Sequence, residues 1–467
     1  MAQCYEVRAP EMADSIHLQR LLALLTQEGV VHGSSLPTAL ALSQPSVSRV
    51  VREAGDRVVR FGGARATRYA ATRVIHARGH TLGHRWPLFL VRPDGAIDEA
   101  GELLALARDR WWIETADSAS WLRSQEPSIG LPWPLQGLRP EGFLGRSYAR
   151  RQGTASVPSD TRQWSDEDVL ATLLTDAAYD PPGHWLVGLR ARDGFEAARE
   201  SAERPKIQRR DLVAYDRLAQ SALAGEIAAS SAGGEQPKFT TTVQDGPSAT
   251  RHLLVKFAPR DNPAGQRWAE LLCCEAIAAQ VLRRAGIATC ESEFSQSENY
   301  AFLEVTRFDR HGALGRSGVA SLAALHGITG LRPTVPWSVA GAVLHDEGLV
   351  SPDVTHALRL IEQFGHCIQN TDMHAGNVSF EYSLRDRLTL APVYDMLPMG
   401  YAPTSLGSLR MPTLALAAPP LRDAVWAQAI ALGQQFWELA AHHPQLSPAL
   451  RAQAETNALT LTILARG

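Results

Sequence analysis

The stretch that decides the fold is NTDMHAGN, residues 370–377, which follows the helix-like run IEQFGHCIQ and is followed by LAPVYDM. Within it, Asp372 and Asn377 lie five positions apart, and Asp395 ends the strand-like stretch downstream. Phosphoryl transfer needs a carboxylate near the attacking hydroxyl and oxygen ligands that hold magnesium across the phosphates of a nucleotide. Asp372, Asn377 and Asp395 supply such oxygens, so the stretch predicts a site for phosphoryl transfer.

The spacing of Asp372 and Asn377 is that of the catalytic loop of protein kinases, but this pattern alone also occurs by chance. A supporting residue is Lys256, the only lysine of the apolar strand HLLVKFAP, where a kinase places its phosphate-binding lysine. Glu275 follows nineteen residues later on the predicted helix WAELLCCEAIAAQVLRRAGI and is the expected ion-pair partner of Lys256. The alternative for Glu275 is a surface position on an amphipathic helix.

Lysine is rare in this chain, because only Lys206, Lys238 and Lys256 stand among 46 basic residues. A compact ammonium meets a single phosphate oxygen in a way that the flat arginine fork does not. Lys206 lies in the charged stretch ERPKIQRRD and is expected to be a solvated surface residue. Lys238 ends SSAGGEQPK, where Gly233 and Gly234 let backbone N–H groups approach phosphates. This loop fits neither the Walker pattern nor the Rossmann pattern.

The first 80 residues predict a small domain of three helices and a β-hairpin. Residues 16–29 carry apolar side chains at helical spacing, SSLPTALA predicts a short helix, and SQPSVSRVVREAG begins with the N-cap Ser43. The segment RVVRFGGARATRYAA then alternates apolar and basic residues around Gly62 and Gly63, as a hairpin with a tight turn does. This order resembles a winged helix-turn-helix.

Arginines gather in this domain, with eight arginines and two acids between residues 43 and 80. Such a local excess of positive charge suits a polyanion, although a solvated arginine face on a docking domain is the alternative. A third helix of this kind reads the major groove, and a wing reaches phosphates. The expected contacts to double-stranded DNA are Ser46, Ser48, Arg49 and Arg52 on the helix and Arg60, Arg65 and Arg68 on the wing.

The length of 467 residues predicts two to four domains. Apolar residues make up 45% of the chain and charged residues 20%, as in ordinary globular proteins. The start of the sequence has no basic flank with an apolar run, and no stretch has the length of a membrane span. Five cysteines without a C-x-x-C pair indicate reduced thiols. We therefore expect a cytoplasmic protein without a membrane partner.

Taken in order, these pieces resemble the HipA family of serine/threonine kinase toxins, and the N-terminal winged helix makes the chain look like the longer YjjJ-type members. The motifs that carry the resemblance are PEGFLGR at 140–146, SAGGEQPK at 231–238, VKF around Lys256, TRFDR at 306–310, NTDMHAGN and VYDM. The resemblance implies an α+β, two-lobed HipA-like protein kinase fold with an N-terminal winged helix-turn-helix domain. The expected domains are that DNA-binding domain at 1–80, a strand-bearing N-terminal kinase lobe with the HipA N-terminal subdomain at 81–310, and a helical C-terminal kinase lobe at 311–467.

The resemblance also implies the roles of the site residues, with ATP and Mg²⁺ as cofactors. Asp372 is then the catalytic base, Asn377 and Asp395 bind magnesium, and Lys256 meets the α- and β-phosphates. Ser231 matches the serine that such kinases autophosphorylate to switch themselves off. The remaining residues of the expected nucleotide site are Ser231, Gly233 and Gly234 in the loop, Thr306 and Phe308 in the hinge, and His374 and Tyr394.

The chain departs from the family pattern at two places. The family usually has Glu at the first hinge position, where this chain has Thr306, so only backbone contacts to adenine are expected there. The loop carries Glu235 and Pro237 at positions where members vary. His374 has an alternative role in packing or capping its loop.

The resemblance implies a protein substrate, and family members attack aminoacyl-tRNA synthetases. It also implies an antitoxin, either as a separate protein or replaced in its DNA-binding part by the N-terminal domain. Two other functions stay open, because the loop DMHAGN also resembles that of aminoglycoside and choline kinases and because a transcription regulator could use such a body to sense nucleotide. A metal site built from His366, His374 and the acids is disfavoured because no H-E-x-x-H spacing is present.

Overall fold

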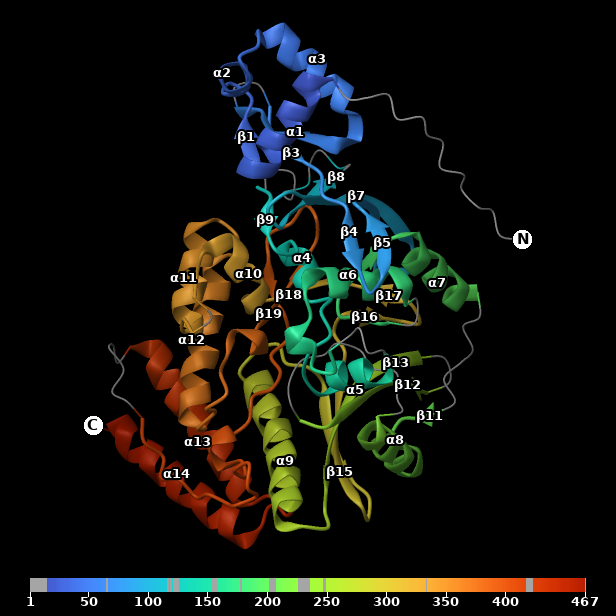
Figure 1. Ribbon diagram of the computed structural model, residues 1–467. Helices are drawn as coiled ribbons and strands as arrows, with labels where there is room; N and C mark the ends of the chain where they lie inside the picture. Colours follow the sequence, from blue (N-terminus) through green and yellow to red (C-terminus); the bar gives the residue numbers. More distant parts are fainter. Residues whose placement is uncertain are drawn as a thin grey trace. The chain divides into compact units, whose positions relative to one another are not determined.

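The computed structural model describes residues 15–63, 66–115, 117, 120, 126–152, 158–176, 179–200, 207–225, 236–246, 249–332, 334–416 and 423–466. It mixes helices and sheets throughout, as the predicted α+β class requires (Figure 1). Two compact units are present. Unit 1 consists of Met1–Pro87 and Gly101–Pro132, and unit 2 consists of Leu88–Ala100 and Trp133–Gly467. The chain passes between them within strands β6 (Arg85–Val91) and β7 (Ile97–Leu106).

Unit 1 begins with three helices and a small sheet, in the order that the sequence predicts. The helices are α1 (Ile16–Glu28), α2 (Leu36–Leu40) and α3 (Gln44–Ala54), and the strands are β1 (Val30–His32), β2 (Val58–Phe61) and β3 (Arg68–Ala71). The predicted hairpin is β2 with β3, which pair antiparallel, and β1 joins as a third strand in the order β1-β3-β2. The sequence pattern did not predict β1 because three residues are too few to show an alternation.

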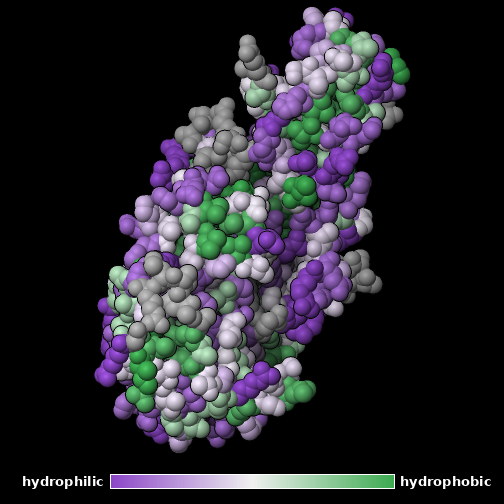
Figure 2. Space-filling model, turned by 90° about the vertical axis from the view of Figure 1, so that its left-hand side faces the viewer, coloured by the Kyte–Doolittle hydropathy of each residue, from purple (hydrophilic) through white to green (hydrophobic). Residues whose placement is uncertain are grey.

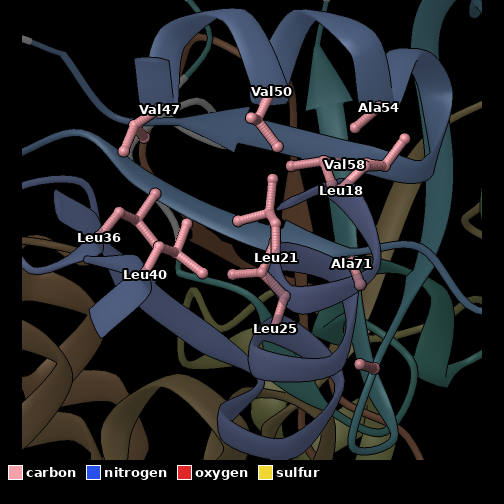
Figure 3. Packing of buried hydrophobic residues seen from close by; sticks show 11 residues of the cluster. Leu18, Leu21, Leu25, Leu36, Leu40, Val47, Val50, Ala54, Val58 and Ala71 are labelled. Carbon is pink, nitrogen blue, oxygen red and sulfur yellow. The ribbon is translucent and has the colours of Figure 1, made fainter. Parts of the chain in front are cut away.

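The three helices of unit 1 enclose a common apolar core. Figure 3 shows Leu21 and Leu25 of α1 and Leu36 and Leu40 of α2 pointing toward one another. The helix ends follow from local chemistry, because Ser43 accepts a hydrogen bond from the backbone N–H of Ser46 at the start of α3. The core consists of Leu18, Leu21, Leu25, Leu36, Leu40, Val47, Val50, Ala54, Val58, Ala71 and Ala107.

The other strands of unit 1 are β4 (Ile75–Ala77), β5 (His80–Gly83), β8 (Arg110–Thr115) and β9 (Ser128–Ile129). Strand β4 pairs with β5, and the part of β7 from Gly101 onward pairs with β8, which pairs with β9. In unit 2, the part of β6 from Leu88 onward pairs with β10 (Trp185–Val187). Short helices accompany it in the sequence: α4 (Trp133–Gln136), α5 (Gly142–Gln152), α6 (Asp166–Thr175) and α7 (Leu189–Glu200).

The central sheet of unit 2 has the order β11-β12-β13-β15-β14. Its strands are β11 (Ile207–Gln208), β12 (Lys238–Asp245), β13 (Ala249–Pro259), β14 (Ser292–Gln296) and β15 (Tyr300–Thr306). Helix α9 (Pro263–Arg284) packs its Ala269 and Leu272 against β13 and β15. Helix α8 (Leu212–Ala224) packs Tyr215 and Ala219 against Phe239 and Val255 of the same sheet. The two helices lie on either side of the strands in Figure 1.

The C-terminal part of unit 2 is mainly helical. Its helices are α10 (Leu322–Thr329), α11 (Trp337–Asp346), α12 (Pro352–Cys367), α13 (Ala424–Ala441) and α14 (Pro448–Arg466). Short strands also occur there: β16 (Arg310–His311), β17 (Gly315–Arg316), β18 (Gly318–Ser321), β19 (Ser379–Tyr382) and β20 (Thr389–Leu390). Over the face that carries α11, α12 and α14, hydrophobic residues form separate patches among hydrophilic ones (Figure 2).

The sequence predicts a strand-like stretch that ends at Asp395, and this prediction is wrong. Strand β20 stops at Leu390, and beyond it only Val393 forms a single bridge, to Thr289. Pro392 lacks the backbone N–H that a continued ladder would need. Within the described residues, no helix combines the length and the apolar character that a membrane span requires.

Candidate active site

A cleft of about 350 Å³ lies in unit 2 where strands β12, β13 and β15 meet the segments 374–379 and 394–395. This volume is at the lower end of the range for ligand sites in proteins. Residues from the sheet, the hinge segment and the loop after α12 meet in it. The lining includes Gln136, Gly137, Arg139, Glu141, Pro182, Lys238, Leu254, Lys256, Cys290, Val305, Thr306, Arg307, Phe308, Asp309, Val319, Ser321, Ala323, Ala324, His374, Gly376, Asn377, Ser379, Tyr394 and Asp395.

Lys256 forms a buried ion-pair cluster with two carboxylates. Its Nζ donates to Oε1 and Oε2 of Glu275 at 2.6 and 2.7 Å, and it also pairs with Oδ1 of Asp395. Lys256 is 3% exposed and Glu275 4% exposed, so both are withdrawn from water. The backbone N–H of Asp395 donates to Glu275 Oε1 at 3.2 Å. Glu275 is therefore not a surface residue of α9, and it fixes both Lys256 and the backbone at Asp395.

Two carboxylates, those of Glu275 and Asp395, pair with the ammonium of Lys256, and these contacts shift the pKa of each group. Burial opposes the charge of Lys256, but Asp395 and Glu275 raise the pKa of Lys256 above its ordinary value. Burial also opposes ionisation of Asp395, but Lys256 and Lys238 hold the pKa of Asp395 below its ordinary value. Burial raises the pKa of Glu275, against the charge of Lys256 and together with that of Asp395. The lowered pKa keeps the Asp395 carboxylate ionised, as a metal ligand must be.

The loop 370–377 is held by its own hydrogen bonds. The backbone N–H of Asp372 donates to Asn370 Oδ1 at 3.1 Å, and Asn377 Nδ2 donates to the carbonyl of Asp372 at 2.9 Å. The N–H of Gly376 donates to Nδ1 of His374 at 3.0 Å, so His374 caps its loop as well as lining the cleft. The amide nitrogen of Asn377 is thus engaged within the loop, which leaves its Oδ1 as the atom that can bind a ligand.

Asp372 has the surroundings of a general base. Its side chain is exposed, and no salt bridge joins it to another residue within the described part of the chain. Partial burial of the carboxyl raises the pKa of Asp372, His374 opposes this rise, and the charge of Asp395 adds to it. A carboxylate with a raised pKa is a better proton acceptor than an ordinary aspartate.

Asp395 has a backbone conformation that few residues other than glycine adopt, with φ at 53°. Such conformations persist where surrounding contacts hold them, often at functional sites. The contacts here are the bond from Asp395 N–H to Glu275 and a long bond of 3.4 Å from Asn370 Nδ2 to the carbonyl of Asp395. Asn370 is buried, and sequence reasoning assigned it no role. Its position at the start of the loop was the signal that could have identified it.

The hinge segment brings Phe308 and Tyr394 together. Their rings are stacked at a centroid distance of 6.2 Å and an interplanar angle of 21°. The hydroxyl of Tyr394 donates to the carbonyl of Gly376 at 2.9 Å, which joins the hinge side of the cleft to the loop. Thr306 accepts a bond from Arg251 through its hydroxyl at 3.2 Å. Its side chain is therefore hydrogen-bonded to Arg251 of β13.

Sequence reasoning missed the charged network behind the hinge. Asp180 accepts hydrogen bonds from Arg307 at 3.0 Å, from Arg310 at 2.7 Å and from Arg316 at 3.0 Å. Asp309 pairs with Arg307 and Arg310 as well, at 2.9 and 2.6 Å. Burial would raise the pKa of Asp309, but the two arginines hold it well below its ordinary value. This network fixes the backbone from Arg307 to Arg310 against the segment that contains Asp180.

Asn377 and Asp395 fit a magnesium ion by their chemistry. Both line the cleft, and they offer an amide oxygen and a carboxylate oxygen, the hard ligands that Mg²⁺ prefers. Within the described part of the chain, no group of three or more His, Cys, Asp or Glu residues could hold a metal. Proteins usually hold Mg²⁺ through one or two carboxylates and the phosphates of a substrate. The site built from His366 and His374 therefore has no support in the described residues.

Several predicted site residues fall outside the described residues. These are Ser231, Gly233 and Gly234 of the glycine loop and Arg65 of the wing. The described chain resumes just before Lys238, which is buried, lines the cleft and faces Lys256 across β12 and β13. The carbonyl of Pro237 accepts a bond from the N–H of Phe257 at 3.0 Å, so the exit of the loop is tied to β13.

The predicted DNA-contacting residues of unit 1 differ in their surroundings. Ser48, Arg49, Arg52 and Arg60 are exposed. Arg68 pairs with Glu126 and lies over the ring of Phe61, 5.2 Å from its centroid, so its charge is already engaged. The hydroxyl of Ser46 lies 2.9 Å from that of Ser43, at the N-cap of α3. The exposed arginines are the ones that are free to meet a phosphate.

Comparisons with known proteins show which families and folds this chain is similar to. The description "YjjJ-like toxin, middle domain" matches residues 82–196, and "HipA-like C-terminal domain" matches residues 230–457. The chain is 43% identical to Toxin YjjJ of Escherichia coli (strain K12) over 331 residues, which are 70% of this chain and 73% of that toxin. It resembles a chain in the structure of the Shewanella oneidensis MR-1 toxin–antitoxin system HipA, HipB and its operator DNA. That likeness has a TM-score of 0.52 at 15% identity and covers 82% of this chain and 96% of that chain, so the two folds are alike.

Proposed function

Because this chain belongs to the family of YjjJ-like toxins with a HipA-like C-terminal domain, we propose that it is an ATP-dependent serine/threonine protein kinase. The observation that carries the proposal is the single cleft in which Lys256, Asn377 and Asp395 meet, next to the loop of Asp372. Phosphoryl transfer needs a cation that binds the phosphates, oxygen ligands for Mg²⁺ and a carboxylate near the acceptor hydroxyl, and these residues supply those groups. The proposed donor is ATP, and the proposed acceptor is a serine or threonine hydroxyl of a protein.

In this mechanism Lys256 binds oxygens of the α- and β-phosphates, and Glu275 keeps its ammonium in place. Asp372 takes the proton of the acceptor hydroxyl while the oxygen bonds to the γ-phosphorus. The bond from that phosphorus to the bridging oxygen of ADP breaks, so the products are a phosphorylated protein, ADP and a proton on Asp372. Asn377 and Asp395 would hold Mg²⁺, which neutralises charge on the phosphates when it is bound. Phe308 and Tyr394, stacked on each other, provide an apolar wall for the adenine.

We further propose that the protein phosphorylates itself at Ser231. With Mg²⁺ and γ-labelled ATP, the full chain is expected to incorporate one phosphate, and Ser231→Ala is expected to remove at least nine-tenths of the label. Mass spectrometry of the labelled chain measures both. Ser230→Ala is the matched control, because it removes the neighbouring serine of the same loop and should label normally. Equal labelling of the two variants would contradict Ser231 as the acceptor.

We propose that unit 1 binds double-stranded DNA through α3 and the hairpin. The support is the exposure of Arg49 and Arg52 on α3 and of Arg60 on β2. The Shewanella structure contains operator DNA together with HipA and HipB, which makes DNA and an antitoxin reasonable partners for this chain as well. The proposed protein substrates are aminoacyl-tRNA synthetases, on the resemblance to the HipA family alone.

In the full chain, the double variant Arg49→Ala/Arg52→Ala is expected to weaken duplex binding and to lower its salt dependence. Each lost phosphate contact lowers the slope of log K against log salt by about 0.9, so the slope should fall by about 1.8. Fluorescence anisotropy with a labelled duplex at several salt concentrations measures this. Arg20→Ala, an exposed arginine on α1, is the control and should bind as the wild type does. An unchanged slope in the double variant would rule out α3 as the phosphate-contacting helix.

A further inference from the structure

A second, larger groove in unit 2 begins where the loop of Asp372 begins. It has a volume of about 860 Å³, and Asn370 and Thr371 form part of its wall. Nothing in the proposed nucleotide chemistry uses it. The lining consists of Gln363, His366, Cys367, Gln369, Asn370, Thr371, Met399, Gly400, Ala402, Pro403, Thr404, Ser405, Arg410, Pro412, Thr413, Ala415, Leu416 and Trp426.

One wall of the groove is the segment 402–416, which two side chains hold in place. Gln369 donates through Nε2 to the carbonyl of Thr413 at 2.7 Å and accepts the N–H of Gly400 on its own carbonyl at 2.9 Å. It does so with a φ of 57°, in the left-handed region that non-glycine residues rarely adopt. Arg267 of α9 donates to the carbonyls of Tyr401 and Arg410, both at 3.3 Å. Hydrogen bonds therefore fix this wall to the residue that follows the end of α12 and to α9, the helix that carries Glu275.

The last part of this wall has the character of an unpaired edge strand. From residue 413 to 416 the side chains are alternately exposed and withdrawn, and Leu414 is only 4% exposed, as in a strand with one buried face. Within the described residues, the N–H groups of Thr413, Leu414, Ala415 and Leu416 donate to no protein acceptor. Successive N–H groups of an extended segment point to opposite edges, so two of these four open donors can face one side and pair with an extended peptide there.

The charges of the groove favour one kind of peptide. None of its described lining residues is acidic, and the exposed Arg410 carries a positive charge. An acidic side chain of a bound peptide would find a partner in Arg410, and a basic one would meet only like charge. Gln363, Thr371 and Thr404 offer amide and hydroxyl groups to the peptide backbone.

We propose that this groove binds an extended segment of the acceptor protein, which adds to residues 413–416 as a strand and places an acidic residue against Arg410. Since the groove begins at Asn370 and Thr371, a serine or threonine at its near end would reach the carboxylate of Asp372. This inference rests on the proposed kinase function and names its acceptor: a hydroxyl residue in an extended, acidic sequence.

The first test measures binding without catalysis. Two pools of nine-residue peptides with a central serine, one with acidic and one with basic flanking residues, are titrated into the full-length Asp372→Asn variant with a non-hydrolysable ATP analogue and Mg²⁺. The acidic pool is expected to bind at least about tenfold more tightly. Adding Arg410→Glu is expected to abolish or reverse this preference, whereas Arg387→Glu, an exposed arginine between β19 and β20, should preserve it. Equal affinity for both pools, or an unchanged preference in Arg410→Glu, would overturn the charge recognition.

The second test addresses the strand pairing. Ala415→Pro removes one backbone donor and is expected to weaken both pools by about the same factor, several-fold or more, because a lost main-chain bond does not depend on peptide charge. Ala415→Val keeps the N–H and is the matched control. Binding of the ATP analogue reports that each variant is folded. Unchanged peptide affinity in a folded Ala415→Pro variant would contradict the strand addition.

The outcome for the groove and the outcome for the kinase are separable. Peptide binding with the predicted preference but without transfer by the wild type would uphold the groove and contradict the kinase proposal. Phosphate transfer that depends on Asp372 but is unchanged in Arg410→Glu and Ala415→Pro would support the kinase proposal and contradict the proposed binding of the acceptor in the groove.

Discussion

The Asp372→Asn variant is expected to lose phosphoryl transfer by a factor of about 100 to 10,000, while nucleotide binding stays within about twofold of the wild type. General base catalysis contributes roughly this range, and asparagine cannot accept the proton of the acceptor hydroxyl. Nucleotide binding should survive because the Lys256 cluster and the stacked rings of Phe308 and Tyr394 do not depend on the Asp372 carboxylate. Labelling with γ-labelled ATP measures transfer, and fluorescence titration with a nucleotide analogue measures binding.

The backbone of the loop should also survive this change, because Asn377 and His374 bond to the carbonyl of Asp372 and not to its side chain. Asp386→Asn, an exposed aspartate that bonds to Ser383 outside the cleft, is the matched control and should transfer phosphate as the wild type does. Transfer by Asp372→Asn at near the wild-type rate would remove Asp372 from the role of base.

Lys256→Met is expected to destabilise unit 2 by about 3 to 5 kcal/mol and to abolish transfer. The substitution leaves Glu275 and Asp395 without their shared cation, and removing one partner of a buried ion pair costs about this much because the remaining charge is uncompensated. Calorimetry should show a melting temperature several degrees lower. Lys256→Arg keeps a cation and should be less destabilised, although its flat fork fits the phosphates poorly.

The cause of this loss of stability can be tested with the double variant Lys256→Met/Glu275→Gln, which removes one of the two carboxylates that have lost their cation. The double variant should regain a large part of the stability lost by Lys256→Met. The pH dependence has a definite sign: Lys256 and Lys238 hold the pKa of Asp395 low, so this stabilisation is complete above about 3.9, the ordinary pKa of aspartate, and is lost as the pH falls further. The stability difference between wild type and Lys256→Met should therefore narrow in acid. A difference independent of pH would contradict the electrostatic explanation.

Much of the candidate site could be predicted because its signals are local. A five-residue spacing identified Asp372 and Asn377, and a lysine in an apolar strand with a glutamate nineteen residues later indicated the pair that the structure contains. The helices of unit 1 were equally readable, because Ser43 and Gly29 mark helix ends by their own chemistry. Where an interaction depends on neighbouring residues of one element, the sequence carries the information.

The parts that could not be predicted depend on residues far apart in the chain. Nothing near Asp180 indicates that it meets Arg307 and Arg310, which lie more than 120 positions later. The positive φ of Asp395 and the partnership of Gln369 with Thr413 arise from packing and leave no periodic trace. The sequence shows that an arginine is charged, but it does not show whether a carboxylate already pairs with that arginine. Glu126 pairs with Arg68 in this way.

The central claim is that this chain transfers the γ-phosphate of ATP to a protein hydroxyl. The most direct test is phosphoproteomics of cells that express either the wild type or Asp372→Asn, with the sites of phosphorylation read by mass spectrometry. The account predicts new phosphoserine or phosphothreonine on one or a few proteins in the wild type alone, in addition to Ser231 of the chain itself. Identical phosphoproteomes, with label appearing instead on a small molecule or nowhere, would contradict it.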